Sequence, residues 1–114
     1  MSWLIDSNTE VVARLVAAGL RVVDDPRNVT PPCALVNPPA FDVMANGVVM
    51  TRTTVTLIAP GPGNADAARA LMTMADSAIA VDNVVSGLPS STIIGQAEYP
   101  SYDLTFEIAL REEN

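Results

Sequence analysis

The stretch that decides the fold is FDVMANGVVMTRTTVTLIA, residues 41–59. Its Asn46-Gly47 pair is the preferred sequence for a tight two-residue turn, because both central positions of that turn need positive φ. The pair predicts a β-hairpin that joins a strand at Phe41–Ala45 to a strand at Val48–Ala59. The second arm is rich in β-branched residues, and most of its polar positions are threonine, which indicates a strand with one half-exposed face.

A helix is predicted ahead of the hairpin, over residues 7–19. Ser7 and Glu10 have the spacing of a capping box, in which each side chain satisfies a backbone amide at the helix start. Glu10 and Arg14 lie one turn apart, in the favourable order for an ion pair. Gly19 is a typical stop, because glycine tolerates the left-handed conformation that ends many helices. Apolar residues share the other face of this helix: Val11, Val12, Leu15 and Val16.

Two short strands are predicted between this helix and the hairpin, at Val22-Val23 and at Cys33–Asn37. Pairs of prolines bracket the second strand, and proline marks strand ends or edges because it cannot donate to a sheet ladder. The intervening segment Asp24–Asn28 has the composition of a turn or loop. The pattern leaves two alternatives for the buried residues of the second strand: Ala34 with Val36, or Cys33 with Leu35.

A second helix is predicted over residues 65–81, after the break at Ala59–Asn64. Asn64 is the expected N-cap, and Asp66 lies where a negative charge favours the helix dipole. The next segment, Asp82–Ser91, has the composition of a polar connection with a turn in it. The apolar face of this helix is predicted to be Ala68, Leu71, Met72, Ala75, Ala78 and Ile79.

Two final strands are predicted at Thr92–Glu98 and Tyr102–Arg111, joined by a turn at Tyr99–Ser101. The last strand alternates cleanly between apolar and other residues, as expected of a strand with one buried face. Tyr99 and Tyr102 flank the turn, and they fit a partner surface and ordinary hairpin positions equally well.

This order of elements predicts an α+β fold. The elements run helix, short strand, hairpin, helix, hairpin, which favours a mixed or antiparallel sheet of four to five strands. Both helices are expected to pack on one face of that sheet. The length of 114 residues and the 49% hydrophobic content suit one domain, residues 1–114, with a core that needs no staples.

The N-terminus lacks the basic segment and long apolar run of a secretory signal. Apolar stretches all fall short of the about 18 residues that a membrane span needs. Cys33 is the single cysteine, so no internal disulfide forms and a reducing compartment is expected. No association with a membrane is predicted.

The charge pattern argues against nucleic-acid recognition. The formal net charge is −7, histidine is absent, and all six positive charges are arginines scattered along the chain. Affinity for nucleic acid requires a cluster of cations that neutralises phosphates. An acidic surface repels DNA, which argues against binding it but is compatible with enclosing it.

No catalytic residue, metal site or cofactor site is predicted. Without histidine, neither a Ser-His-Asp nor a Cys-His arrangement can be built. The acids Asp24, Asp25 and Asp42 lack the spacing of a calcium loop. The turn Gly61–Gly63 lies where phosphate loops occur, but it lacks their lysine and its prolines remove amide donors. Cys33 lies in an apolar segment and is expected to be a buried hydrophobic residue.

Several stretches, taken with the order of elements, carry a resemblance to a known family: Val11–Leu15, Asp25–Arg27, Pro31–Pro39, Leu57–Pro62 and the strands around Tyr99–Tyr102. They resemble the tail terminator proteins of long-tailed bacteriophages, over nearly the whole chain. The resemblance implies a hexameric ring at the head-proximal end of the tail tube. Such a ring stops polymerisation of the tube protein and offers a surface to the head connector, while DNA passes through its lumen without being read.

The resemblance also implies a virion protein, assembled in the host cytoplasm, whose partners are its own copies, the major tail tube protein and the head–tail connector. The expected contact elements are the Asn46-Gly47 hairpin, the loop Asp24–Asn28 and the turn Gly61–Asn64. Two alternatives stay open: another neck or tail-tube component, and a cytosolic α+β domain with a small-molecule pocket between helices and sheet. The predicted donors of ion pairs between subunits, by the geometry of guanidinium–carboxylate pairing, are Arg27, Arg52 and Arg69.

Overall fold

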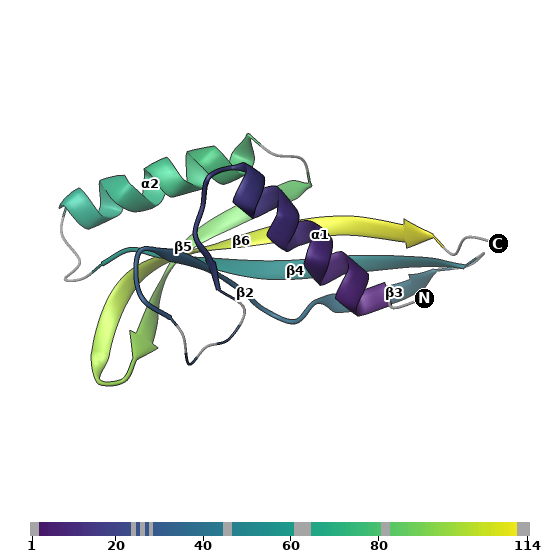
Figure 1. Ribbon diagram of the computed structural model, residues 1–114, viewed down its shortest axis with the longest axis horizontal. Coiled ribbons are helices and arrows are strands. Elements are labelled where there is room, and N and C mark those ends of the chain that lie inside the picture. The colour runs from purple at the N-terminus through teal and green to yellow at the C-terminus, as the bar shows by residue number, and fades with distance from the viewer. Residues whose placement is uncertain are drawn as a thin grey trace.

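The computed structural model of the chain describes residues 3–23, 25, 27, 29–44, 47–60, 65–80 and 83–111. Within these ranges, two helices lie on a six-stranded mixed sheet (Figure 1). The α+β class is therefore confirmed, with more strands than the four or five expected. In chain order the elements are α1 (Trp3–Ala17), β1 (Val22–Val23), β2 (Cys33–Val36), β3 (Ala40–Met44), β4 (Val48–Ile58), α2 (Ala65–Ile79), β5 (Val84–Ile94) and β6 (Ala97–Arg111).

The sheet has the strand order β1-β2-β4-β6-β5, and β3 pairs with β4 on the same side as β2. Only β1 and β2 pair in parallel, through Val22 opposite Ala34 and Val23 opposite Leu35; the other described pairs are antiparallel. The two-residue β1 thus joins the sheet, and it accounts for part of the extra strand count.

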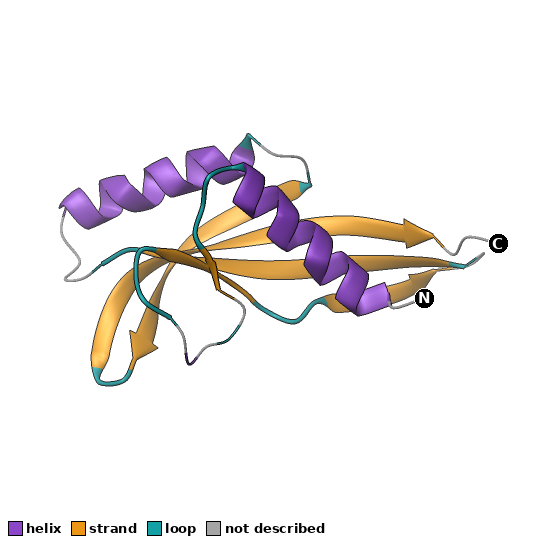
Figure 2. Cartoon of the chain, in the orientation of Figure 1, coloured by secondary structure: helices purple, strands orange, loops and turns teal. Residues whose placement is uncertain are grey.

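The core lies between the helices and one face of the sheet. On this face Val55 is opposite Leu104, and Thr53 is opposite Phe106, across the two central strands. Leu15 of α1 and Leu71 of α2 belong to the same buried cluster, so both helices cover one face, as predicted (Figure 2). A smaller cluster lies on the opposite face: Val23, Cys33 and Ile58.

The two clusters show which residues of β2 are buried on each face of the sheet, which the sequence pattern left open. Ala34 and Val36 face the helices and belong to the main core, whereas Cys33 is fully buried in the smaller cluster. Both faces of this strand are therefore packed, because Val29, Ile94 and Tyr99 lie against the smaller cluster.

Helix α1 begins at Trp3, so the predicted capping box at Ser7 and Glu10 is wrong. Ser7 lies on the face that carries Val11 and is fully buried against β4, where it hydrogen-bonds to Thr51. The end of the helix and its surface ion pair are as predicted: α1 ends at Ala17 before Gly19 at φ 85°, and Arg14 lies 2.9 Å from Glu10.

Helix α2 lies where the spacing predicted it, over Ala65–Ile79. Its buried face is Ala67, Leu71, Ala75 and Ala78. Three residues of the predicted apolar face, Ala68, Met72 and Ile79, are instead exposed. The predicted cap at Asn64 lies outside the described residues.

The second hairpin differs most from the prediction. Residues 84–91, expected in a polar connection, form most of β5, and Tyr99–Ser101 continue β6 instead of making a turn. The turn lies at Gly95, which has φ 64°. Pro89 fits because β5 is an edge strand, and Pro100 fits because β4 pairs with β6 only as far as Ser101.

The connection of the first hairpin is also one residue longer than predicted. Met44 is the last residue of β3 paired with β4, opposite Val48, so three residues lie between the paired ends. Gly47 has φ 69°, as expected of a three-residue hairpin connection that ends in the left-handed conformation. Asn46 lies outside the described residues.

The molecule is elongated, with extents of 50 × 28 × 21 Å. Its radius of gyration is 14.7 Å, above the about 13 Å of a compact domain of this length. The excess arises because the two hairpins extend toward opposite ends of the long axis (Figure 1).

Candidate assembly surfaces

Strand β5 forms one free edge of the sheet, since among the described strands it pairs with β6 alone. The Glu107 amide of β6 donates to the Asn83 carbonyl at 2.9 Å, so the backbone groups of Glu107 face the β5 side. Backbone groups alternate in direction along a strand. The backbone groups of Tyr102 therefore face β4, and the backbone of its partner Pro89 faces away from β6. By the same alternation, the outward-facing residues of β5 are Gly87, Pro89, Ser91 and Ile93.

Pro89 divides this free edge into two unequal parts. Proline has no amide hydrogen, so an added strand cannot form a continuous ladder across it. The distal part, Ser90–Ile94, keeps the outward amide and carbonyl groups of Ser91 and Ile93 without interruption. It is also uncharged, and the Ile93 side chain is 70% exposed.

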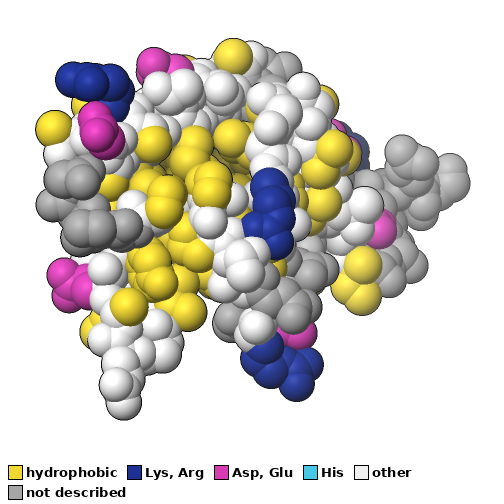
Figure 3. Space-filling model, turned by 60° about the vertical axis from the view of Figure 1, so that its left-hand side comes forward, with side chains coloured by type: hydrophobic (Ala, Val, Ile, Leu, Met, Phe, Trp, Pro, Cys, Tyr) yellow, Lys and Arg dark blue, Asp and Glu magenta, His cyan; other side chains and the backbone are white. Residues whose placement is uncertain are grey.

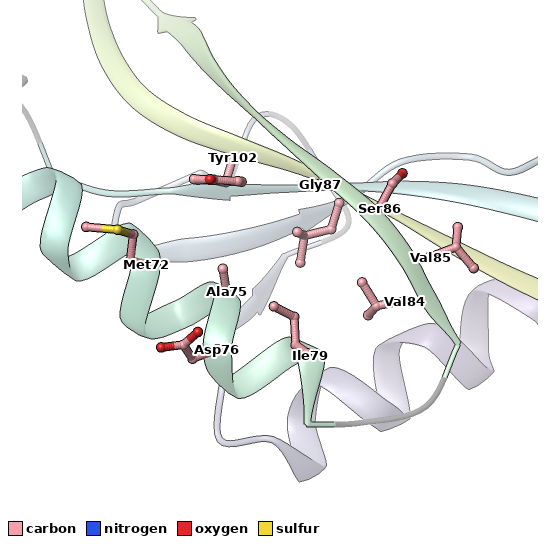
Figure 4. Close-up of a pocket in the computed structure, with 10 residues that line it drawn as sticks. Met72, Ala75, Asp76, Ile79, Val84, Val85, Ser86, Gly87 and Tyr102 are labelled. Atoms are coloured by element: carbon pink, nitrogen blue, oxygen red, sulfur yellow. The ribbon is translucent and has the colours of Figure 1, made fainter.

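An apolar groove lies between α2 and the inner part of β5 (Figure 4). We call it the α2–β5 groove; its volume is about 470 Å³. Ile79 of α2 faces Val84 of β5 across it, while Met72 and Val85 remain more than half exposed. Its lining residues are Met72, Ala75, Asp76, Ile79, Val84, Val85, Ser86, Gly87, Tyr102 and Leu104.

A second hollow lies nearer the N-terminus of α2, between that helix and the β5–β6 hairpin, with Leu71, Pro89 and Tyr102 in its lining. Figure 3 views this end of the molecule, where hydrophobic side chains form one continuous area with charged groups at its margin. Large exposed apolar areas mark interaction surfaces in soluble proteins.

On the other side of the sheet, β1 is the outer strand beside β2, and β3 forms a separate free edge farther along β4. The Asn37 amide donates to the Thr54 carbonyl at 3.1 Å, so the backbone of Thr54 faces this side, and by alternation so do Met50 and Arg52. Their partners Asp42 and Ala40 face β4. The backbone groups of Phe41 and Val43 therefore face outward.

Exposed apolar side chains surround this second edge. The side chains of Phe41 and Val43 are 50% and 73% exposed. They line a pocket of about 360 Å³ together with the first turn of α1, which lies beside β3 (Figure 1). We call the group the α1–β3 surface: Trp3, Leu4, Ile5, Phe41, Val43 and Met44.

The sheet face opposite the helices is polar along β4 and β6. Thr54 is opposite Thr105, Arg52 is opposite Glu107, and the Thr56 hydroxyl donates to Asp103 at 3.0 Å. This face offers scattered single charges to solvent. Along the described residues of β4 and β6, it has no row of cations that would hold phosphates.

The predicted interface arginines each lie beside an acid of their own chain. Arg52 lies 2.5 Å from Asp42, across the β3–β4 hairpin. Arg69 lies 3.8 Å from Asp66, and both side chains are largely exposed, which makes this the loosest of the pairs. The predicted contact residues Asn46 and Gly61 lie outside the described residues, whereas Gly47 lies at the hairpin end, half-buried.

Arg27 and Asp25 form a local ion pair in the loop after β1. The Arg27 Nη2 and Nε atoms lie 3.1 and 3.2 Å from the Asp25 carboxylate, and the Arg27 amide donates to it at 2.9 Å. The hydrogen bonds from the Arg27 side chain lower the pKa of Asp25 most, and the bond from the Arg27 amide lowers it further. The structure thus brings these two residues together as a local turn.

The described residues contain no group of three or more potential metal ligands. Cys33 is fully buried, as predicted, and burial raises the pKa of its thiol despite the opposing effect of Arg21. None of the helices, in the parts of the chain described, is long and apolar enough to cross a membrane.

The chain matches no protein-family model and no curated protein. Sequence reasoning missed both the β5 edge and the α1–β3 surface. One signal for the first was available, since residues 83–97 carry no charge, which is unusual for an exposed edge strand.

Proposed function

We propose that this chain is a structural, non-catalytic subunit that assembles with its own copies into a closed ring, as a tail terminator of a long-tailed bacteriophage. The ring is a hexamer at the head-proximal end of the tail tube. It stops polymerisation of the major tail tube protein and offers a surface to the head–tail connector. The subunit is made in the host cytoplasm and resides in the virion neck.

One observation carries the assembly part of this proposal: the free edges at β5 and β3 lie on opposite sides of the sheet, and each has exposed apolar side chains beside it. The two surfaces differ in sequence and shape. A chain with two different apolar surfaces favours head-to-tail contacts between copies. These contacts close into a ring when a whole number of copies, each rotated by the same angle, completes a full turn. The hexameric count and the place in the tail come from the resemblance.

The charge of the chain supports an inert lumen. The net charge is −7, and the uncovered face of β4 and β6 carries Asp103 and Glu107 with Arg52. A lumen lined by such a surface does not retain passing phosphates, because like charges repel. DNA is therefore enclosed without specific binding.

A non-catalytic role fits the chemistry of the described residues. The chain has no histidine, and its cysteine is buried with a raised pKa, which disfavours the reactive thiolate. We accordingly propose no enzymatic activity and no cofactor. Among the arginines, Arg69 is the best donor for a contact between copies, because its pair with Asp66 is long and exposed.

The proposal is tested with purified chain, alone and with the major tail tube protein, by light scattering and negative-stain microscopy. Rings, or tubes capped at a finite length, are expected. A chain that stays monomeric beside the tube protein and leaves tube length unrestricted would contradict the proposal. Rings that join tubes without limiting their length would instead support another neck or tube component.

The α2–β5 groove favours a second candidate, a small-molecule-binding domain, because its size and apolar lining suit a ligand. A monomer that retains a metabolite through purification, and loses it when Ala75 is changed to a larger residue, would support that alternative. Ala65→Leu, at an exposed position of the same helix that lines neither hollow, is the matched control.

A further inference from the structure

We infer that the distal edge of β5 in one copy, Ser90–Ile94, pairs with the β3 edge of the next copy, Ala40–Met44. This inference rests on the proposed self-assembly and names the segments that perform it. The partner is a second copy of this chain, and the contact combines a short backbone ladder with apolar side chains.

The two segments match in length and in hydrogen-bonding groups. Each contains five residues. Each turns the backbone amide and carbonyl groups of two residues outward: Ser91 and Ile93 on β5, Phe41 and Val43 on β3. Two residues on each side are enough for two hydrogen-bonded pairs of an antiparallel ladder. Pro89 confines the ladder to the distal part of β5, because it offers no amide hydrogen.

The strand directions also agree. Strands β5, β6, β4 and β3 each run antiparallel to the next, so β5 and β3 of one copy point in opposite directions. Two copies joined edge to edge without turning over therefore pair these strands antiparallel. Their helices then lie on the same side of the joined sheet, and the uncovered faces on the other.

The side chains of the two segments fit the same arrangement. Phe41 and Val43 lie on the helix side of the sheet, since they pair with the buried residues Thr51 and Val49. Ile93 lies on that side too, by alternation from Gly87, whose partner Leu104 is in the core. Residues opposite one another in a ladder have side chains on one face, so Ile93 contacts the Phe41–Val43 pair.

Charge confines the contact to these segments. A chain of net charge −7 repels its copies over most of its surface. Ser90–Ile94 has no charged residue, and Asp42, the single acid of β3, is paired with Arg52 on the opposite face. The paired segments also lie toward opposite ends of the 50 Å long axis, so neighbouring copies are staggered along that axis (Figure 1).

The test uses proline to remove one outward amide from each edge. Val43→Pro and Ser91→Pro leave the bonds to β4 and β6 intact, because both amides face outward, and circular dichroism with thermal melting checks the fold. Val43→Thr and Ser91→Ala keep the amide and are the matched controls. Ile93→Lys blocks the same edge with a charge, without a change in the backbone.

Assembly is measured by analytical ultracentrifugation, with the tube protein present if the wild-type chain assembles only beside it. Val43→Pro, Ser91→Pro and Ile93→Lys are each expected to weaken association by about tenfold or more, since each removes hydrogen bonds or buries a charge. Both controls are expected to assemble normally. In a mixture of the two proline variants, the β5 edge of Val43→Pro can pair only with the β3 edge of Ser91→Pro. The mixture is therefore expected to stop at a heterodimer.

Each other outcome overturns the inference in a distinct way. If Val43→Pro alone fails to assemble, β3 pairs with β3 in a two-fold dimer. If all variants assemble normally, the copies meet through other surfaces, and the edge pairing is wrong while the ring proposal stands. If the wild-type chain assembles neither alone nor with the tube protein, the proposed function fails with it.

Discussion

The Ser7 hydroxyl of α1 lies 2.6 Å from the Thr51 hydroxyl of β4, and both side chains are fully buried. Thr51 uses its single hydroxyl hydrogen to donate to the Ile108 carbonyl at 3.0 Å. Ser7 must therefore be the donor to Thr51. This chain of bonds connects the first helix to the two central strands.

Replacement of Thr51 by valine is expected to destabilise the fold by about 1–3 kcal/mol, because it leaves the Ser7 hydroxyl buried without a partner. Ser7→Ala is expected to cost about 1 kcal/mol, since Thr51 keeps its bond to Ile108. Urea unfolding with an unchanged m-value measures both. Equal costs for the two variants would contradict the assigned donor direction.

Thr53 lies two residues further along the same strand, and Thr53→Val is expected to stabilise the fold instead of destabilising it. The Thr53 side chain is 1% exposed, and its hydroxyl has no hydrogen-bond partner among the described residues. Valine has the same shape without the buried polar atom, so the free energy of unfolding is expected to rise by about 1 kcal/mol. Thr54→Val, on the exposed face, is the control and is expected to change it by less than about 0.5 kcal/mol. A lower stability for Thr53→Val would show that this hydroxyl has a partner in solution.

Cys33 is expected to react slowly with thiol reagents in the folded protein. Its side chain is fully buried, and burial raises the pKa of the thiol, so little thiolate forms at pH 8. Release of the coloured product of an aromatic disulfide reagent measures the rate, and the urea-unfolded chain is the control. Equal rates in the folded and unfolded chains would rule out this environment.

The Asp25–Arg27 turn predicts a local effect of pH. Because the bonds from Arg27 lower the pKa of Asp25 in the folded chain, the pair contributes stability above the ordinary pKa of an aspartate. That contribution disappears as the pH falls through the lowered, folded-state pKa. Arg27→Ala is expected to raise the pKa of Asp25 toward its ordinary value, as measured by an NMR titration of its carboxyl carbon. Arg69→Ala, far along the chain, should leave that titration unchanged.

Pro89→Val is expected to increase self-association. It restores an outward amide in the middle of the β5 edge, so the free groups run without interruption from Gly87 to Ile93. Leu88→Val is the control, because the backbone of Leu88 faces β6. Sedimentation at several concentrations measures the effect, and an unchanged or weaker association of Pro89→Val would contradict the assigned direction of this edge.

Local patterns in the chain predicted elements that depend on neighbouring residues. The apolar spacing of α2, the stop at Gly19 and the alternation from Leu104 to Leu110 all have counterparts in the structure. Each of these signals needs only a few adjacent residues to form a turn of helix or one side of a strand. The Glu10–Arg14 ion pair belongs to the same class.

The incorrect predictions concern residues whose role depends on distant parts of the chain. Ser7 has the composition of a helix cap, but α1 begins earlier and buries its hydroxyl against β4. Residues 84–91 have the composition of a loop, yet pairing with β6 makes them a strand, because an edge strand tolerates glycine, serine and proline.

By itself, the sequence determined an α+β chain without histidine, with an acidic surface, two helices and at least two hairpins, since composition and short-range spacing are sufficient for those features. Only the tertiary structure decided which strand edges stay free and which apolar side chains surround them. Those properties arise from pairing between residues far apart in the chain, and Phe41 and Ile93 acquire their roles only when β4 and β6 separate them to opposite edges of one sheet.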